Sequence, residues 1–152
     1  MTVLTRFSEF YSRLDLSDLH LLPQIYSADI QLIDPVGTHC GLEALTAYFE
    51  GLLTNNDACE FDILSISDPK HVRTSTVVHE QYMEVSVVWQ MHFATPALNK
   101  GKRVTVDGMS LLHIRDERIF YHRDYYDMGQ MVYEYLPVLS WLINTIKKRL
   151  RA

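Results

Sequence analysis

Three side chains of this 152-residue chain suit acid–base chemistry. Asp34 follows the apolar run 30–33 and precedes Pro35, which lacks a backbone N–H donor and fixes its own φ. A strand that ends at residue 33 would hold the Asp34 carboxylate at its end. His122 and Asp124 lie two positions apart in a later predicted strand, so they share one of its faces. Such a pair can polarise a water, and either carboxylate is a candidate general base.

Helix and strand periodicity places further side chains around these acids. Tyr11 lies on the apolar stripe of the first predicted helix, where its hydroxyl can donate a hydrogen bond. Ser110 lies on the inward face of a strand that neighbours the strand of Asp124. An apolar pocket with a few convergent polar groups is the usual composition of a small-molecule site. Strand alternation predicts four residues in the pocket walls: Trp89, Met91, Phe120 and Tyr126.

Each candidate also has a purely structural interpretation. Asp34 suits an Asx-turn, because aspartate side chains commonly accept hydrogen bonds from the backbone that follows them. Tyr11 suits a core position with its hydroxyl satisfied, and His122 with Asp124 suits a buried structural hydrogen bond. The wall residues suit an ordinary hydrophobic core. The residues alone leave both interpretations open.

Apolar periodicity changes from helical to strand spacing along the chain. Large apolar residues first recur every three or four positions, whereas in segment 82–93 they occupy the odd positions. The pattern predicts one α+β domain with helices packed on a curved, mainly antiparallel sheet. The second helix contains Pro23, which kinks or restarts a helix. Predicted helices cover 4–14, 17–26 and 42–52, with a longer one from 128 that Pro137 interrupts; predicted strands cover 30–33, 61–66, 82–93, 103–114 and 119–127.

Composition argues against several kinds of partner. A net charge of −5 without a basic run does not suit binding to nucleic acid phosphates. No run reaches about 18 apolar residues and the first residues lack the apolar segment of a secretion signal, so we expect a soluble cytoplasmic protein. Cys40 and Cys59 lack Cys-x-x-Cys spacing, and we expect neither a metal nor a cofactor. Histidines without ligand spacing are His20, His71, His79, His92 and His113; acids expected at the surface or an interface are Asp57, Asp62, Asp107, Asp116 and Glu117.

The order of elements and two short motifs resemble the cone-shaped NTF2-like superfamily. The motifs are Asp-Pro-Val-Gly at 34–37 and His-Arg-Asp-Tyr-Tyr-Asp at 122–127. SnoaL-like proteins, ketosteroid isomerases and, more distantly, limonene epoxide hydrolases are the most similar groups. The resemblance covers residues 1–127 and implies a cone that encloses a pocket. Residues 128–152 would form an amphipathic helical extension packed on the same domain.

The ketosteroid isomerase pattern implies roles for three residues. Its general base lies in a Glu-Asp-Pro-Val-Gly segment that Asp34 matches, and its oxyanion-hole tyrosine lies on the first helix, where Tyr11 falls. Its second oxyanion donor is a protonated aspartic acid, and counting back from Ile114 places Ser110 there. A serine can donate a hydrogen bond but is not an acid matched to an enolate. The resemblance implies proton transfer and departs from true steroid isomerisation at this residue.

The final strand resembles a second group. Limonene epoxide hydrolases carry Arg-Asp-Tyr-Phe-Asp there, with a first aspartate that activates water, and Asp124 matches it. Their Arg-x-Asp on the central strand is replaced by Val-Trp-Gln at 88–90. SnoaL-type cyclases also use an acid on the final strand. The resemblance therefore makes Asp124 a rival to Asp34, in a steroid-isomerase-like or polyketide-cyclase-like reaction.

We expect a protein that binds a small apolar carbonyl, polyketide-like or isoprenoid-like ligand. Its chemistry would be that of a cofactor-independent isomerase, cyclase or hydrolase: Asp34 or Asp124 as base, Tyr11 and Ser110 as donors, His122 orienting. A non-catalytic ligand-binding or dimerisation module is the alternative. We also expect a homodimer formed through the outer sheet face. The apolar terminal helix, which ends in basic residues, would cover the pocket or the dimer, and attachment to a membrane surface is its other interpretation.

Overall fold

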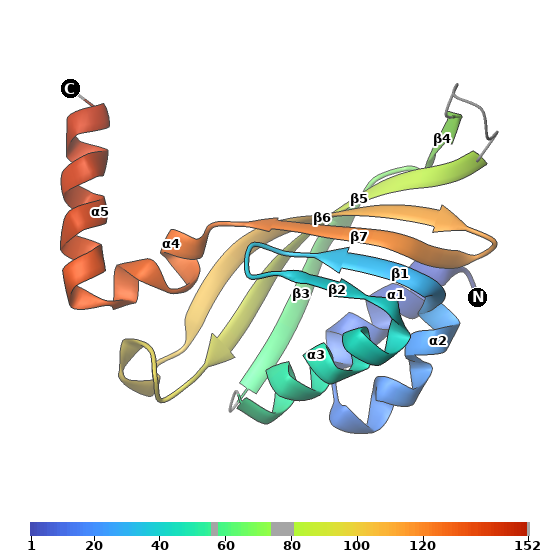
Figure 1. Ribbon diagram of the computed structural model, residues 1–152, viewed down its shortest axis with the longest axis horizontal. Coiled ribbons are helices and arrows are strands. Elements are labelled where there is room, and N and C mark those ends of the chain that lie inside the picture. Colours follow the sequence, from blue (N-terminus) through green and yellow to red (C-terminus); the bar gives the residue numbers. More distant parts are fainter. Residues whose placement is uncertain (56–57, 74–80, 152) are drawn as a thin grey trace.

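A curved sheet forms the body of the protein (Figure 1). The computed structural model describes residues 1–55, 58–73 and 81–151, so Asp57 and His79 lie outside the described residues. Within these ranges, seven strands pair in the order β2-β1-β7-β6-β5-β3, with β4 also paired to β5. All pairs are antiparallel except β1 with β7. The strands are β1 (Tyr26–Ile33), β2 (Thr38–Cys40), β3 (Ala58–Ile66), β4 (Lys70–Arg73), β5 (Gln81–Ala94), β6 (Val104–Arg115) and β7 (Arg118–Tyr126).

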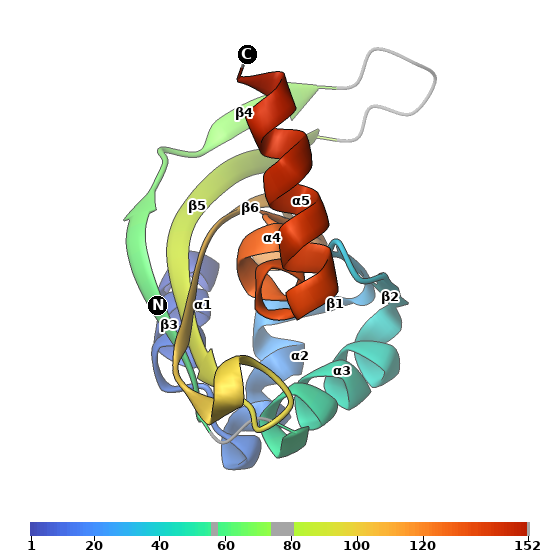
Figure 2. The same ribbon diagram turned by 90° about the vertical axis from the view of Figure 1, so that its left-hand side faces the viewer.

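Three helices cover one face of this sheet: α1 (Val3–Arg13), α2 (Leu22–Ile25) and α3 (Gly41–Asn55). Figure 2 shows the sheet curling around the space that these helices close. Helical spacing explains the orientation of α1, whose buried residues all lie on its apolar stripe. The result is the predicted α+β architecture, with the hydrophobic core between the helices and the inner sheet face.

Strand alternation positions the inner face as predicted. In β5 the buried residues are odd-numbered, from Val85 to Phe93, whereas in its neighbour β6 they are even-numbered, from Val104 to Ile114. The register pairs Trp89 with Gly108 and continues along the whole hairpin. Side chains of successive residues point to opposite faces of a strand. The two longest strands therefore each contribute one apolar face to the core.

Several local elements differ from the prediction. Segment 17–26 begins as a 3-10 helix, η1 (Leu16–Leu21), and restarts as α2 because Pro23 occupies the first turn, where its missing N–H costs nothing. Strand β1 begins earlier than predicted, at Tyr26. Two short strands lie outside the predicted elements: β2, which pairs with β1, and β4, which pairs with β5. The β5–β6 connection contains a short 3-10 helix, η2 (Asn99–Gly101).

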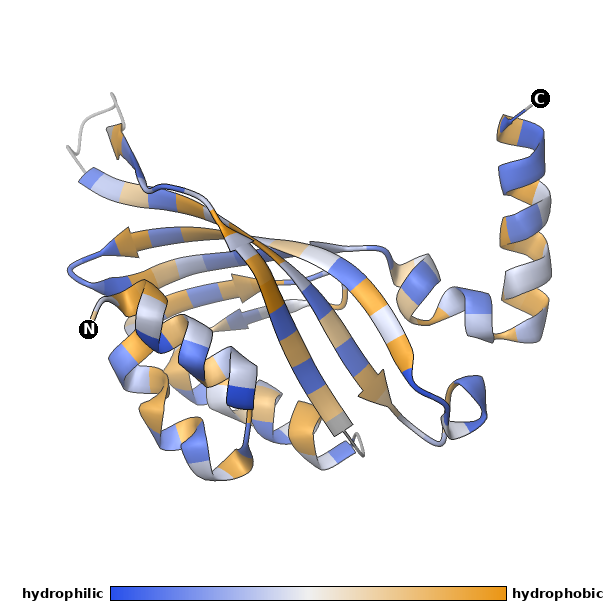
Figure 3. Ribbon diagram, turned by 180° about the vertical axis from the view of Figure 1, so that it is seen from behind, coloured by the Kyte–Doolittle hydropathy of each residue, from blue (hydrophilic) through white to orange (hydrophobic). Residues whose placement is uncertain are grey.

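Only the first part of the C-terminal segment packs on the cone: Met131 and Tyr135 lie against the hydrophobic core, whereas the helix from Pro137 has no buried residue. The C-terminal segment consists of α4 (Met128–Met131), the 3-10 helix η3 (Tyr133–Tyr135) and α5 (Pro137–Leu150). α5 projects away from the sheet and contains no buried residue (Figure 3). Its main contacts are with η3, where Lys147 pairs with Glu134. No helix in the described ranges is long and apolar enough to cross a membrane.

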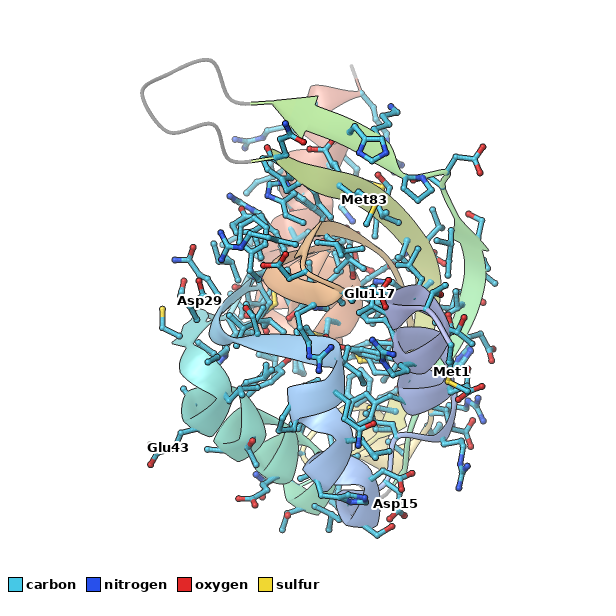
Figure 4. The ribbon with its side chains drawn as sticks, turned by 90° about the vertical axis from the view of Figure 1, so that its right-hand side faces the viewer. Met1, Asp15, Asp29, Glu43, Met83 and Glu117 are labelled. Atoms are coloured by element: carbon cyan, nitrogen blue, oxygen red, sulfur yellow. The ribbon has the colours of Figure 1, made fainter. Side chains whose placement is uncertain are left out.

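The end of the cone near the N-terminus is tied together by Arg6. Its guanidinium donates hydrogen bonds to the carbonyl oxygens of Met1 at 2.9 Å and Glu117 at 3.3 Å. Met1 and Glu117 lie on the side of the molecule that faces the viewer in Figure 4. Strands β1 and β7 run in parallel to the opposite end, which carries Asp34 and the last residues of β7. The candidate acids are therefore positioned at that end.

Candidate functional site

Asp124 lies at the centre of a hydrogen-bond cluster on the inner sheet face. Its Oδ1 lies 2.8 Å from His122 Nε2 and accepts a 2.5 Å hydrogen bond from the Ser110 hydroxyl. Ser110 Oγ accepts a 2.8 Å bond from the Trp89 indole N–H. Ser110 and His122 are buried. Because Asp124 Oδ2 bonds to none of the described residues, one oxygen of this carboxylate stays available to a ligand.

A chain of hydroxyl groups continues from the other side of the imidazole. Tyr26 Oη lies 3.0 Å from His122 Nδ1, and Tyr11 Oη lies 2.9 Å from Tyr26 Oη. An ionised Asp124 only accepts hydrogen bonds, so the network assigns the Nε2–H tautomer to His122. Nδ1 then accepts from Tyr26, and Tyr26 accepts from Tyr11. The hydroxyl groups therefore all donate in the same direction, from Tyr11 to Tyr26 and from Tyr26 to the imidazole.

Burial keeps the two tyrosines of this chain in their neutral form. Burial raises the pKa of Tyr11 well above its usual value, and the neighbouring Tyr26 and the charge of Asp124 add to the increase. The pKa of Tyr26 is also raised, chiefly by burial. A neutral phenol keeps its proton and can still donate a hydrogen bond. Both hydroxyls therefore remain proton donors across the physiological pH range.

Trp89 reaches Ser110 because the neighbouring strand has no side chain beneath the indole. Gly108 pairs directly with Trp89, and a Cβ built on Gly108 would lie 2.1 Å from the indole ring. A glycine inside a strand often marks such a close approach. The indole also packs against Phe61, with ring centroids 5.4 Å apart. The glycine therefore fixes the position of the indole N–H that supports Ser110.

Asp34 has a different set of partners, all of which are structural. Its Oδ1 accepts hydrogen bonds from the backbone N–H groups of Val36 and Gly37, both at 2.8 Å. Its Oδ2 accepts the Tyr48 hydroxyl at 3.0 Å. Both oxygens are thus engaged, and the Asx-turn interpretation describes the geometry. Burial, followed by the charge of Asp34, raises the pKa of Tyr48 well above its usual value.

Asp124 is in the lining of two hollows. The inner one has a volume of about 10 Å³, which is room for about one water. The outer one, at the mouth of the cone, has a volume of about 180 Å³. Asp34 lines the outer hollow and Tyr11 the inner one, so Asp124 is the candidate acid that reaches both. The inner hollow is lined by Phe7, Tyr11, Phe61, Ile63, Trp89, Ser110 and Asp124.

The four residues predicted in the pocket walls lie in different parts of the structure. Trp89 lines the inner hollow and Tyr126 the outer one, while Met91 is buried in the hydrophobic core. The predicted position of Phe120 is wrong, because its ring lies against outer-face residues: centroids are 5.8 Å from Tyr82 and 5.9 Å from His113. A register shift in the β6–β7 pairing between His113 and Ile114 breaks the expected alternation.

Asp107 lies on the outer face and accepts a 2.8 Å hydrogen bond from Gln90. In the described ranges, no three His, Cys, Asp or Glu side chains gather closely enough to hold a metal ion. Cys40 and Cys59 are both free thiols, and burial raises the pKa of Cys59 to about 12. The candidate chemistry is therefore that of the Asp124 cluster.

Comparison with known protein families finds a domain that matches most of the chain. The SnoaL-like domain matches residues 7–122, which run from within α1 to the middle of β7. The chain belongs to the SnoaL-like domain family. The match includes Tyr11, Asp34, Ser110 and His122 and ends two residues before Asp124. No curated protein sequence matches the chain.

Solved structures of SnoaL-like proteins share the fold at low sequence identity. A putative SnoaL-like polyketide cyclase from Jannaschia sp. CCS1 has a TM-score of 0.66 at 12% identity, over 88% of this chain and 90% of that chain. One from Shewanella putrefaciens CN-32 has a TM-score of 0.64 at 16% identity, over 90% and 96%. A hypothetical protein with a ketosteroid isomerase-like fold from Catenulispora acidiphila DSM 44928, in complex with trimethylamine, has 0.61 at 17%, over 82% and 86%.

Two tyrosines of this SnoaL-like site escaped the sequence analysis. Tyr26 was assigned to the second helix, but it begins β1 and links Tyr11 to His122. Tyr48 falls within the predicted helix 42–52, and its hydroxyl donates to Asp34. A signal existed for Tyr48, since a tyrosine facing the core needs a partner for its hydroxyl. Nothing in the local sequence pairs Tyr26 with His122, which lies 96 positions away.

Proposed function

We propose that this SnoaL-like protein binds a small apolar carbonyl compound and moves a proton on it, with Asp124 as the base and no cofactor. The observation that supports the proposal is the asymmetry of the Asp124 carboxylate. Oδ1 is held by His122 and Ser110, whereas Oδ2 bonds to none of the described residues, and Asp124 lines both hollows. A general base needs such a free, oriented lone pair within reach of the proton that it removes.

The hydroxyl chain supplies the complementary donor. When Oδ2 takes a proton from a carbon next to the substrate carbonyl, Asp124 becomes a neutral carboxylic acid and the C–H electron pair passes to the carbonyl oxygen as an enolate. His122 and Ser110 still donate to Oδ1, and Tyr26 still donates to His122 Nδ1. The Tyr11 hydroxyl turns its hydrogen from Tyr26 to the enolate oxygen and stabilises it as a neutral donor. Return of the Oδ2 proton to a carbon of the substrate restores the carboxylate.

This assignment differs from the roles implied by ketosteroid isomerases. Asp34 matches their base in sequence, but its two oxygens already accept three hydrogen bonds. Ser110, at the position of their second oxyanion donor, donates to Asp124 and so orients the base. The reaction class is therefore enolisation that leads to isomerisation or to a cyclase-type ring closure, with steroids and polyketides as candidate substrate classes.

Deuterium exchange tests the proposal directly. Phenylacetone in D₂O reports removal of the proton next to its carbonyl by NMR, and cyclohex-3-enone reports isomerisation by ultraviolet absorbance. We expect Asp124→Asn to lower the enzyme-dependent rate about a hundredfold or more, as loss of a general base does. The matched variant Asp34→Asn keeps the turn and should retain the rate within about threefold. A loss confined to Asp34→Asn would reverse the assignment.

A ligand-binding module without catalysis is the second candidate. The small inner hollow favours it, because about 10 Å³ does not admit a substrate carbonyl unless the lining side chains move. Native mass spectrometry of the purified protein identifies a retained ligand. A ligand that binds equally well to wild type and Asp124→Asn, with no exchange on any carbonyl probe, would establish this second function instead.

A further inference from the structure

Two neighbouring segments at one end of the molecule concentrate its positive charge. Segment 95–103, which connects β5 to β6, contains Lys100, Lys102 and Arg103, and segment 137–152, which contains α5, has four basic residues. Neither segment contains an Asp or a Glu. Together they hold half of the 14 Lys and Arg residues, so the rest of the chain, with seven basic and 19 acidic residues, carries −12. These two segments are here called the basic end.

The two segments of the basic end lie next to each other. A groove of about 520 Å³ is lined by Lys100 and Lys102 of the first segment and, where α5 begins, by Tyr135, Leu136 and Pro137. In Figure 1, α5 runs across the long axis of the molecule, and Figure 2 looks onto this end with α5 in front and the β5–β6 connection below it. A flat surface that faces this end would therefore contact α5 along its length.

Helix α5 has one apolar face and one basic face. Its apolar residues recur at three- and four-residue spacing, so they share a face, and none of them is buried: Val138, Leu139, Leu142, Ile143, Ile146 and Leu150. At about 100° per residue, Lys147, Lys148 and Arg151 lie on the opposite side. Trp141 is 69% exposed and lies at the border between the two faces. A basic face, an apolar face and a tryptophan are typical of helices that lie in the plane of a membrane interface.

The charges of α5 are available to an anionic surface. Lys147 pairs with Glu134, whereas Lys148, Arg149 and Arg151 are exposed and pair with none of the described residues. Each basic residue near an anionic lipid surface strengthens binding about fivefold. The acidic rest of the chain opposes this attraction, but α5 projects away from it (Figure 3), and charges more than about 10 Å apart are largely screened at about 0.1 M salt. The basic end therefore meets an anionic surface before the acidic body does.

A partner for this end must offer negative charge and an apolar interior at once. Leu150 is 82% exposed and Val138 is 78% exposed. Nucleic acid presents a dense row of phosphates, whereas an anionic bilayer presents charged headgroups directly above apolar acyl chains. We propose that the basic end docks on an anionic lipid bilayer, with α5 in the plane of the interface and its apolar face toward the acyl chains. Lys100 and Lys102 then lie at the headgroups.

Docking in this orientation brings the mouth of the cone to the bilayer. The outer hollow is lined by residues 123–126 of β7, and α4 begins two residues later, at Met128. The route of the ligand, which rests on the proposed function, then leads from the bilayer into the outer hollow, so the substrate class is a membrane lipid with a carbonyl group. Docking itself uses none of the Asp124 cluster and does not depend on the reaction.

Co-sedimentation of the full chain with vesicles tests the docking. We expect wild type to bind vesicles of phosphatidylserine and phosphatidylcholine about tenfold or more tightly than vesicles of phosphatidylcholine alone, because the basic end meets anionic headgroups. Trp141→Glu, and the double variant Lys148→Gln with Arg151→Gln, should each lower the affinity about tenfold or more. All three side chains are exposed, and circular dichroism verifies folding.

The matched controls change exposed residues away from the basic end. Leu16→Glu adds a charge on η1, and Arg13→Gln with Lys70→Gln removes two basic residues from α1 and β4. Each control should bind vesicles within about twofold of wild type. Wild type that stays in the supernatant with phosphatidylserine vesicles would overturn the proposal, as would an equal loss of binding in the charge control or unchanged binding in Trp141→Glu. A supernatant fraction that instead binds RNA would assign the basic end to nucleic acid.

The route of the ligand has a separate readout. A long-chain methyl ketone held in the same vesicles and soluble phenylacetone both report deuterium exchange next to a carbonyl. We expect Trp141→Glu to lower exchange about tenfold on the vesicle-held ketone and to leave exchange on phenylacetone within about twofold. Equal losses on both ketones would contradict the route. No exchange on either ketone by wild type would refute the proposed function, whereas co-sedimentation would still decide the docking.

Discussion

The two aspartates of the mouth show how similar sequence contexts produce different chemistry. Asp34 follows β1 and Asp124 lies near the end of β7, two strands that run in parallel to the same end of the cone, and both aspartates line the outer hollow. Asp34 uses both oxygens to hold a turn and Tyr48. Asp124 uses one oxygen and leaves the other free. A carboxylate that matches a family motif is thus a base only when its lone pairs remain available.

The largest effect on stability is expected at the structural aspartate. Asp34→Ala removes three hydrogen bonds to a buried carboxylate, so the free energy of unfolding should fall by about 3 kcal/mol. Asp34→Asn is the matched control, because its amide oxygen still accepts the two backbone N–H groups. Urea denaturation measures both. Equal losses in the two variants would mean that charge, and not the turn, is what Asp34 contributes.

A smaller effect on stability is expected at Gly108, which lies against the Trp89 indole. Gly108→Ala forces a Cβ into the space of the Trp89 indole, so the free energy of unfolding should fall by about 2 kcal/mol through overpacking. The displaced indole would also release Ser110, which should lower the exchange rate on phenylacetone. Gly51→Ala is the control, since a Cβ there meets nothing within 4 Å. Unchanged activity in Gly108→Ala would show that Ser110 orients Asp124 without the indole.

The pH dependence of the free energy of unfolding distinguishes the buried Tyr11 and Tyr26 from tyrosines at the surface. Burial raises the pKa of Tyr11 and Tyr26, so above pH about 10 the unfolded chain releases protons that the folded protein retains. Stability is therefore fully present below pH 10 and falls as the pH rises further. Tyr26→Phe should flatten this decline by about 1.4 kcal/mol per pH unit. Thermal denaturation between pH 9 and 12 measures how stability changes with pH. The same slope in wild type and Tyr26→Phe would contradict a raised pKa for Tyr26.

Regular strands and helices were predictable because their periodicity is local. Odd-numbered burial in β5 and the packed stripe of α1 follow from the spacing of apolar residues alone. The orientation of Phe120 was not predictable in this way, because one register shift reverses a face without changing the local composition. Helix α5 was predicted, but where it packs depends on long-range contacts that periodicity does not specify.

The sequence predicted which residues form the candidate site, but it predicted only some of their hydrogen-bond partners. Sequence alternation placed His122 and Asp124 together, and the structure joins them by a 2.8 Å hydrogen bond. Asp34 was chosen for its motif, yet the competition for its oxygens depends on backbone geometry after Pro35 and on Tyr48. Tyr26 was missed because its partners come from α1 and β7. Partners distant in sequence decide which acid remains free.

The small inner hollow has a kinetic consequence. A ligand larger than one water reaches Tyr11 only after the surrounding aromatic side chains have changed rotamer. The open arrangement would be a minor population of the free protein, and the observed affinity would be the intrinsic affinity reduced by that population. The rate of ligand capture would level off at the rate of side-chain opening as the ligand concentration rises. Selectivity would then depend on which molecules can occupy the opened interior before it closes.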